Sequence, residues 1–218
     1  MRGFIDGEYQ DGEIRGCGFI AGVRGMGKTT EMGRLLSLCT GGVLFFDPLA
    51  RHEHVLPGRR LIHHWVELEN YLRVNRGRRF RIIYQPRGGS IDEHFKGVAA
   101  CVRAFGWMIF AIDELDMLCG ARFGDARMPQ ELYDLVNYGR HARVSMLATA
   151  RYPMSVARGF TSQCATLRLF YMREKKHLQY FEEYIGEEIS RLPSLPKYHY
   201  LFWDGSENSQ IFMAGRAL

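Results

Sequence analysis

The glycine-rich segment 22–29, "GVRGMGKT", constrains the fold of this 218-residue chain more than any other feature. It follows the apolar run "CGFIAG" at 17–22, whose composition favours a short buried strand. Residues 28–39 come next, with apolar side chains recurring at three- and four-residue spacing, as on one face of a helix. A strand joined to a helix by a glycine-rich turn indicates an α/β unit, because glycines let the backbone curl tightly between the two.

Apolar runs alternate with amphipathic segments along the rest of the chain. This alternation predicts an α/β fold, with a mostly parallel central sheet and helices on both faces. The run at 107–114 is almost continuously apolar, which is typical of a strand buried on both sides. Pro129 fits the first position of a helix. Further strands are predicted at 42–48, 79–85, 144–150, 165–172 and 198–205, the last as an edge strand or hairpin, and helices at 91–106, 129–142 and 173–189.

Bulk properties indicate one soluble globular domain. The chain is 46% apolar and 24% charged, and no apolar run approaches the about 20 residues that a helix needs to span a bilayer. The first sixteen residues contain acidic side chains and no continuous apolar segment, so we expect no secretory signal and a cytoplasmic location. We expect a single domain over 1–218, with its core at 17–172 and a C-terminal helix and edge strand in 173–218.

Cysteine and histidine patterns do not predict a metal site. The five cysteines include no C-x-x-C pair, and their odd number suits neither a disulfide framework nor a four-cysteine zinc site, so we expect them to be buried as small apolar residues. The net charge of +5 permits a polyanionic partner without requiring one. Four histidines are interpreted as loop residues, namely His52, His54, His63 and His64.

Gly22, Gly27, Lys28 and Thr29 match the phosphate-loop pattern G-x-x-x-x-G-K-[ST]. In such a loop successive backbone N–H groups face the phosphates of a nucleotide, and the following helix adds its positive N-terminus. Lys28 would reach the β- and γ-phosphates, Thr29 would bind Mg²⁺ and Thr30 would contact the α-phosphate. The predicted nucleotide-contacting residues are Gly22, Arg24, Gly25, Met26, Gly27, Lys28, Thr29 and Thr30.

The pair Asp113-Glu114 ends the apolar run at 107–114. Parallel sheets of this kind bind ligands at the carboxyl ends of their strands, so Asp113 is expected beside the phosphate loop, where it would hold Mg²⁺ through water. Glu114 would polarise the water that attacks the γ-phosphate. The sequence contains no N-K-x-D motif for guanine, and the acidic pair favours ATP with Mg²⁺. This combination resembles the P-loop division with an additional strand between the two motif strands and a catalytic glutamate.

Four stretches together resemble the FtsK/HerA superfamily of DNA-translocating ATPases, over roughly 17–172. Within that superfamily, "GRH" before the strand at 144–150 is most similar to viral genome-packaging ATPases of the poxvirus and membrane-containing icosahedral virus type. The resemblance implies a homo-oligomeric ring, commonly a hexamer, that pumps double-stranded DNA into a preformed capsid. It implies a capsid vertex or membrane protein as a partner, and a location in the host cytoplasm or at the virion. The stretches are "IAGVRGMGKTT", "LFFDP", "MIFAIDELDML" and "YGRHARVSMLATARYP" with "FTSQCATLRLFYM".

The sensor strand departs from the family pattern. Where the family usually has Thr-Gln or Ser-Gln, this chain has Thr149-Ala150, so sensing of the γ-phosphate would fall to the Thr149 hydroxyl or to Arg151. Ring ATPases also use an arginine from the neighbouring subunit to stabilise transition-state charge, and the "GRH" match makes Arg140 the first choice. The further candidates for this role are Arg143, Arg151 and Arg158.

Two other functions remain open. One is a related motor, such as a helicase or an ATPase of conjugation or phage assembly, and the other is a nucleotide-dependent binding module with little turnover, which the missing glutamine favours. The basic stretch 73–87 fits either a DNA contact or, more commonly, a solvated loop or subunit contact. Its arginines are Arg73, Arg76, Arg78, Arg79, Arg81 and Arg87.

Overall fold

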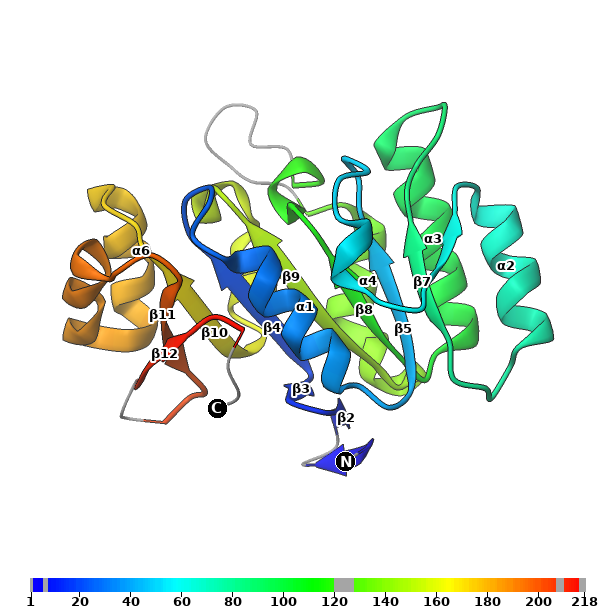
Figure 1. Ribbon diagram of the computed structural model, residues 1–218, viewed down its shortest axis with the longest axis horizontal. Coiled ribbons are helices and arrows are strands. Elements are labelled where there is room, and N and C mark those ends of the chain that lie inside the picture. Colours follow the sequence, from blue (N-terminus) through cyan, green and yellow to red (C-terminus); the bar gives the residue numbers. More distant parts are fainter. Residues whose placement is uncertain (1, 6–7, 120–127, 207–209, 216–218) are drawn as a thin grey trace.

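A computed structural model describes residues 2–5, 8–119, 128–206 and 210–215. Within these residues a nine-stranded sheet forms the centre of the molecule (Figure 1). Its strands are β4 (Cys17–Ala21), β5 (Gly42–Phe46), β6 (Arg60–Ile62), β7 (Arg81–Tyr84), β8 (Met108–Ile112), β9 (Val144–Ala150), β10 (Cys164–Phe170), β11 (His199–Trp203) and β12 (Gln210–Met213). Their order in the sheet is β12-β11-β10-β4-β9-β8-β5-β7-β6. All neighbours from β10 to β6 are parallel, whereas β11 and β12 form an antiparallel hairpin at one edge, as the sequence predicts for 198–205.

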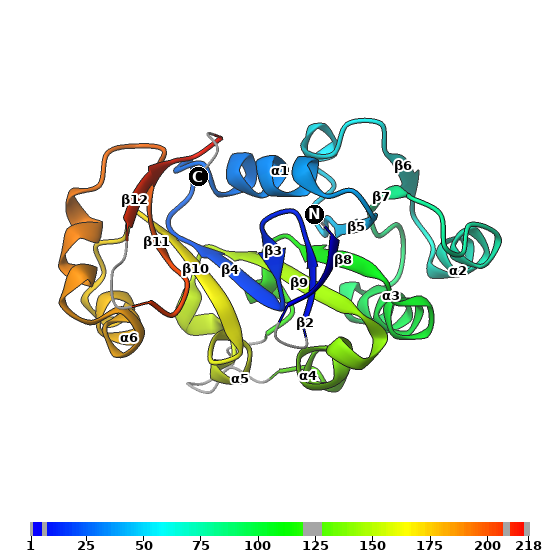
Figure 2. The same cartoon turned by 90° about the horizontal axis from the view of Figure 1, so that it is seen from below.

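Helices cover both faces of this sheet, so the expected three-layer α/β fold is confirmed (Figure 2). On one face, α1 contributes Met32 to a core that includes Phe45 of β5. On the other face, Phe95 of α3 joins Phe46, the next residue of β5, because successive strand side chains point to opposite sides. The helices are α1 (Lys28–Leu38), α2 (Trp65–Val74), α3 (Ile91–Phe105), α4 (Gln130–Tyr138), α5 (Arg158–Thr161) and α6 (Lys175–Ile185). None of the helices in the described part of the chain is long and apolar enough to cross a membrane.

Strand β9 lies between β4, which leads into the phosphate loop, and β8, which leads to the acidic pair. The additional strand between the two motif strands is therefore confirmed. This additional strand is β9, which follows both motifs in the sequence. Strands β5 and β7 lie between the two motifs in the sequence, but in the sheet they are on the other side of β8. The carboxyl end of β9 is consequently placed between the phosphate loop and the acidic pair, at the upper edge of the sheet in Figure 1.

Several boundaries differ from the sequence expectation. The helix predicted at 129–142 is regular only in α4, followed by a 3₁₀ turn (Gly139–Ala142), and Pro129 is its N-cap and not its first residue. Of the helix predicted at 173–189, only α6 (Lys175–Ile185) is α-helical. It ends before Gly186, whose φ of 71° favours glycine, and 3₁₀ turns follow it (Gly186–Ser194). Residues 60–62 and 65–74, for which the sequence predicted neither a strand nor a helix, form β6 and α2. Only Leu68 and Leu72 of α2 are buried, so the apolar pattern was too sparse to indicate a helix.

A small antiparallel sheet near the N-terminus was not predicted. It consists of β1 (Arg2–Ile5), β2 (Glu8–Asp11) and β3 (Ile14–Arg15), which are short. The buried carboxylate of Asp11 accepts hydrogen bonds from the backbone N–H groups of Thr40 (2.8 Å) and Gly41 (2.6 Å), and so fixes the loop after α1. All five cysteines are buried with free thiols, as the sequence predicts.

A buried charge network fastens α1 to the sheet. Arg168 of β10 is 1% exposed, and its Nε lies 3.4 Å from Oε1 of the fully buried Glu31 in α1. Tyr200 of β11 donates its hydroxyl to the same oxygen at 3.0 Å. Arg34 bridges Glu31 (2.7 Å) and Glu13 (2.7 Å). The helix that begins at the phosphate loop is thereby tied to β10 and β11.

We expect the substitution Glu31→Ala to lower the free energy of unfolding by about 3 kcal/mol, because it leaves Arg168 buried without its nearest counter-charge. Urea denaturation checks this. The matched control is Glu188→Ala, which removes an exposed ion pair with Arg191 and should cost less than about 1 kcal/mol. Equal losses in the two variants would contradict a stabilising role for the network.

Candidate functional site

The glycine-rich loop connects β4 to α1 and requires glycine at two positions. Gly22 has a φ of 148°, and a Cβ there would lie 2.6 Å from the Cβ of Phe170. Gly27 has a φ of 105°, and a Cβ there would lie 2.9 Å from Cδ1 of Tyr198. Only glycine fits these positions without strain, so the loop can wrap closely around phosphate groups.

Lys28 begins α1 and points back into the loop. Its Nζ donates hydrogen bonds to the carbonyl oxygens of Gly22 (2.8 Å) and Val23 (3.1 Å). Burial lowers the pKa of Lys28 to about 8, although the carboxylate of Asp113 acts in the opposite direction. The lysine is therefore held at the loop by weak acceptors, which the oxygens of a phosphate would replace with stronger ones.

The other residues of the predicted nucleotide site lie on the same loop and on the first turn of α1. Arg24 and Gly25 are exposed, whereas Met26 is half-buried against the α1 side of the core. Thr29 is half-buried and Thr30 is exposed. The structure thus gathers all of these predicted residues around one loop.

Asp113 and Glu114 follow β8 at the same edge of the sheet. Asp113 is 2% exposed, and its backbone N–H donates to the carbonyl of Phe46 at 3.0 Å. Thr149 of β9 donates its hydroxyl to Oδ1 of Asp113 at 2.6 Å and accepts a hydrogen bond from the N–H of Glu114 at 2.9 Å. One hydroxyl therefore orients both members of the acidic pair.

Glu114 has a backbone conformation that is unusual for its residue type, with a φ of 52°. Its carboxylate accepts a hydrogen bond from the guanidinium of Arg151, the second residue after Thr149. Burial raises the pKa of Glu114, while Arg151 acts to lower it. A half-buried carboxylate with a raised pKa is suited to accept a proton from water. Sequence reasoning named Arg151 as a candidate but not as the partner of Glu114.

His52 was missed as a site residue, because the sequence suggested only a loop. Its Nε2 lies 3.2 Å from Oδ2 of Asp113, which raises the pKa of His52 through this contact. Asp47, at the end of β5, holds the loop in place, since its Oδ2 accepts hydrogen bonds from the N–H of His52 (2.9 Å) and from Nε2 of Gln85 (3.0 Å). The sequence feature that could have pointed to this loop is Asp47 in "LFFDP", because it ends a strand at the same side of the sheet as Asp113.

The oxygen donors at this edge fit a magnesium ion. Oδ2 of Asp113 is buried and forms no well-aligned hydrogen bond, and Oδ1 of Asp47 is also buried without a hydrogen-bond partner. Carboxylate and hydroxyl oxygens are the ligands that Mg²⁺ prefers. Asp113 and Thr29 are the residues that would hold the ion, directly or through water.

The candidate trans-acting arginines lie in different places. Arg140 is exposed in the 3₁₀ turn that precedes β9. It therefore lies near the amino end of this seven-residue strand, whereas Thr149 lies near the carboxyl end, about 20 Å away. Arg143 lies at that same edge and stacks on Trp107. Arg158 forms an exposed ion pair with Glu183. Neither Arg140 nor Arg143 reaches the acidic pair of its own chain.

No family model matches the sequence, and no curated protein matches it. Solved structures do match. The genome packaging NTPase B204 from Sulfolobus turreted icosahedral virus 2, in complex with AMPPCP, aligns with a TM-score of 0.71 at 15% identity, covering 90% of this chain and 96% of that one. VirB4 of Thermoanaerobacter pseudethanolicus aligns with a TM-score of 0.63 at 11% identity, covering 92% and 89%.

The N-terminal domain of zonular occludens toxin from Neisseria meningitidis is a third match, with a TM-score of 0.53 at 12% identity and coverage of 92% and 95%. These identities are low, so the likeness concerns the fold. The chain therefore has the fold of the P-loop ATPases of the FtsK/HerA type.

Proposed function

We propose that this protein hydrolyses ATP with Mg²⁺ and uses the energy to move double-stranded DNA. One observation carries the proposal: the phosphate loop with Lys28, the acidic pair Asp113-Glu114 and the hydroxyl of Thr149 converge at one edge of the sheet. Phosphate binding, metal binding and water activation are the three requirements for hydrolysis of a nucleoside triphosphate. Each has a residue of suitable chemistry at this edge.

The proposed mechanism assigns one task to each side chain. Lys28 would leave the loop carbonyls and pair with the β- and γ-phosphates, and Thr29 and Asp113 are the residues that would hold Mg²⁺. A bound Mg²⁺ would supply positive charge that offsets the negative charge of the phosphates. Glu114 accepts a proton from the attacking water. Thr149 holds the carboxylate of Asp113 and the backbone N–H of Glu114.

Arg151 is the residue that we propose as the sensor in place of the missing glutamine. It holds Glu114 through an ion pair, and a γ-phosphate would compete for the same guanidinium. Glu114 would then be released to act on water when ATP is bound. Thr149 contributes by contact with both acidic residues, so Ala150 need not supply a polar group.

Assembly into a ring is part of the proposal. Arg140 is exposed and lies at the edge of the sheet opposite its own acidic pair, so it can act on a γ-phosphate only in a neighbouring subunit. We propose a homo-oligomer, commonly a hexamer in motors of this fold, in which residues 1–218 act as one motor domain. Arg140 stabilises transition-state charge in that arrangement.

Packaging of a viral genome is the specific task that we propose. The support is the likeness to B204, which is a genome packaging NTPase, together with the net charge of +5. The motor would act in the host cytoplasm or at the packaging vertex of the virion, on a capsid or membrane protein. A second candidate is another DNA motor of the same fold, which the likeness to VirB4 favours. A third is a regulatory module with little turnover, which the missing glutamine favours.

The substitution Glu114→Gln should lower kcat by at least about 100-fold, with or without double-stranded DNA, because the amide cannot accept a proton from water. Binding of ATP should remain, since the amide leaves the phosphate loop intact. Phosphate release at low salt measures the turnover. Glu187→Gln, an identical change at an exposed position, is the control and should behave as the unmodified protein. Full hydrolysis by the Glu114→Gln variant would disprove the assigned role.

Binding of ATP should take up protons at alkaline pH. The pKa of Lys28 is about 8 before phosphates arrive, so much of the lysine is neutral above that pH, and the negative phosphates restore its charge. Affinity for a nonhydrolysable ATP analogue should therefore fall as the pH rises above about 8. Calorimetry in buffers of different ionisation enthalpy measures the proton uptake. The Lys28→Met variant should show none, and unchanged uptake in that variant would exclude Lys28 as its source.

A further inference from the structure

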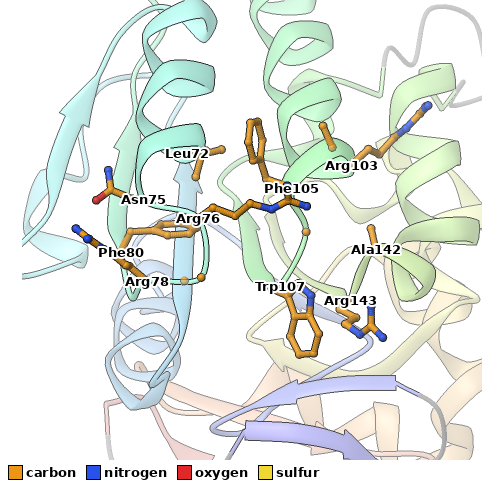
Figure 3. A pocket seen from close by; sticks show the side chains of 14 residues that line it. Leu72, Asn75, Arg76, Arg78, Phe80, Arg103, Phe105, Trp107, Ala142 and Arg143 are labelled. Atoms are coloured by element: carbon orange, nitrogen blue, oxygen red, sulfur yellow. The ribbon is translucent and has the colours of Figure 1, made fainter.

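A hollow of about 400 Å³ opens at the amino ends of the central strands, whereas the candidate site lies at their carboxyl ends (Figure 3). Three connections surround it, namely the turn between α2 and β7, the turn between α3 and β8, and the segment that enters β9. Phe80 forms one wall and packs against Gly42, where a Cβ would lie 2.5 Å from the ring. The volume is that of a site for a small molecule or for part of a larger one.

The lining of the hollow carries charge of one sign. Arg76, Arg78, Arg103 and Arg143 line it, and no aspartate or glutamate does. Arg103 is partly neutralised by an exposed ion pair with Asp134 at 2.5 Å. Within the described residues, no carboxylate lies within ion-pair distance of Arg76 or Arg78. The hollow is therefore a focus of positive potential.

The guanidinium groups are spread out and do not converge on one point. Figure 3 shows the side chain of Arg76 reaching across the hollow toward Phe105, with Arg78 on one side and Arg103 and Arg143 on the other. A single small anion would meet only one or two of these groups. An extended polyanion that crosses the hollow would meet several in succession, and guanidinium groups bind phosphate through paired hydrogen bonds.

The backbone at the rim is strained so that an aromatic and a cationic side chain project outward. Trp107 has a φ of 52° and is 49% exposed, and Arg143 has a φ of 58°. The N–H of Trp107 donates to the carbonyl of Ala142 at 3.0 Å, and the guanidinium of Arg143 lies 4.5 Å from the centre of the Trp107 ring. Strain of this kind concentrates at functional sites. At Gly106, a Cβ would lie only 1.9 Å from the oxygen of Ala142, so only glycine permits this turn.

The hollow and the acidic pair lie at opposite ends of the same two strands. Trp107 immediately precedes β8, which leads to Asp113, and Arg143 immediately precedes β9, which contains Thr149. These strands are hydrogen-bonded neighbours along their length. A ligand in the hollow would thus contact the start of both strands whose ends carry the catalytic side chains, without competing with ATP.

We infer that this hollow is a contact site for the sugar-phosphate backbone of DNA, an inference that rests on the proposed function for the identity of the cargo. Phosphates bind Arg76 and Arg78, and Arg103 and Arg143 receive the adjacent ones. The contacts involve no base edges, which suits a motor that must move DNA of any sequence. The position of Arg73 agrees with this assignment. This arginine belongs to the same basic stretch as Arg76 and Arg78, but it lies outside the hollow and pairs with Glu69.

The test measures binding of a short labelled DNA duplex to the full chain by fluorescence anisotropy over a range of salt concentrations. The double variant Arg76→Ala/Arg78→Ala should bind the duplex at least about tenfold more weakly, with the salt slope reduced by about two. The control double variant Arg60→Ala/Arg73→Ala removes the same charge from exposed residues outside the hollow and should change affinity less than about threefold. ATP turnover without DNA should be unchanged in both.

Unchanged duplex affinity and salt slope in the Arg76→Ala/Arg78→Ala variant would overturn the inference. So would displacement of the duplex by pyrophosphate or by polyglutamate as effectively as by unlabelled duplex, since either would indicate a site for a small anion or an acidic protein. If the duplex accelerates ATP turnover by the unmodified protein but still binds this double variant fully, the contact site is wrong and the proposed function stands. If the variant loses duplex binding but DNA leaves ATP turnover unaffected, the site stands and the proposed function fails.

Discussion

The hydrogen bonds of the Thr149 hydroxyl are the interaction on which the candidate site depends. This group donates to Asp113 and accepts from the N–H of Glu114, so it joins β9 to the end of β8. The connection exists only because β9 is inserted between β4 and β8, which separates the phosphate loop from the acidic pair by one strand.

Around this centre, the charged side chains are held by partners that a bound nucleotide would replace. Lys28 is bonded to carbonyls of its own loop, Arg151 pairs with Glu114, and His52 lies against Asp113. Each of these contacts occupies a group that the proposed mechanism needs for phosphate, water or metal. Binding of ATP with Mg²⁺ would exchange all three sets of partners at once, so it would rearrange the ends of β5, β8 and β9 together.

The part of this arrangement that is local in sequence was predictable. The phosphate loop is specified by a contiguous motif, and the rule that ligands bind at the carboxyl ends of parallel strands placed Asp113 beside it. Thr149 was named through the resemblance of its strand to the sensor strand of the superfamily. His52 could not be placed, because its position depends on how the loop after β5 folds back over the sheet and is held by Asp47. Helix α2 was missed because it buries only two leucines. The hollow at the opposite edge is made by three distant segments, so the basic stretch alone could not reveal it.

The central claim is that hydrolysis of ATP moves double-stranded DNA, and displacement of a third strand from a DNA triplex tests it most directly. A motor that travels along the duplex removes the third strand, whereas a protein that merely binds DNA does not. We predict displacement by the unmodified protein with ATP and Mg²⁺, and none with a nonhydrolysable analogue. Hydrolysis of ATP at a rate indifferent to DNA, with the third strand left in place, would contradict the account.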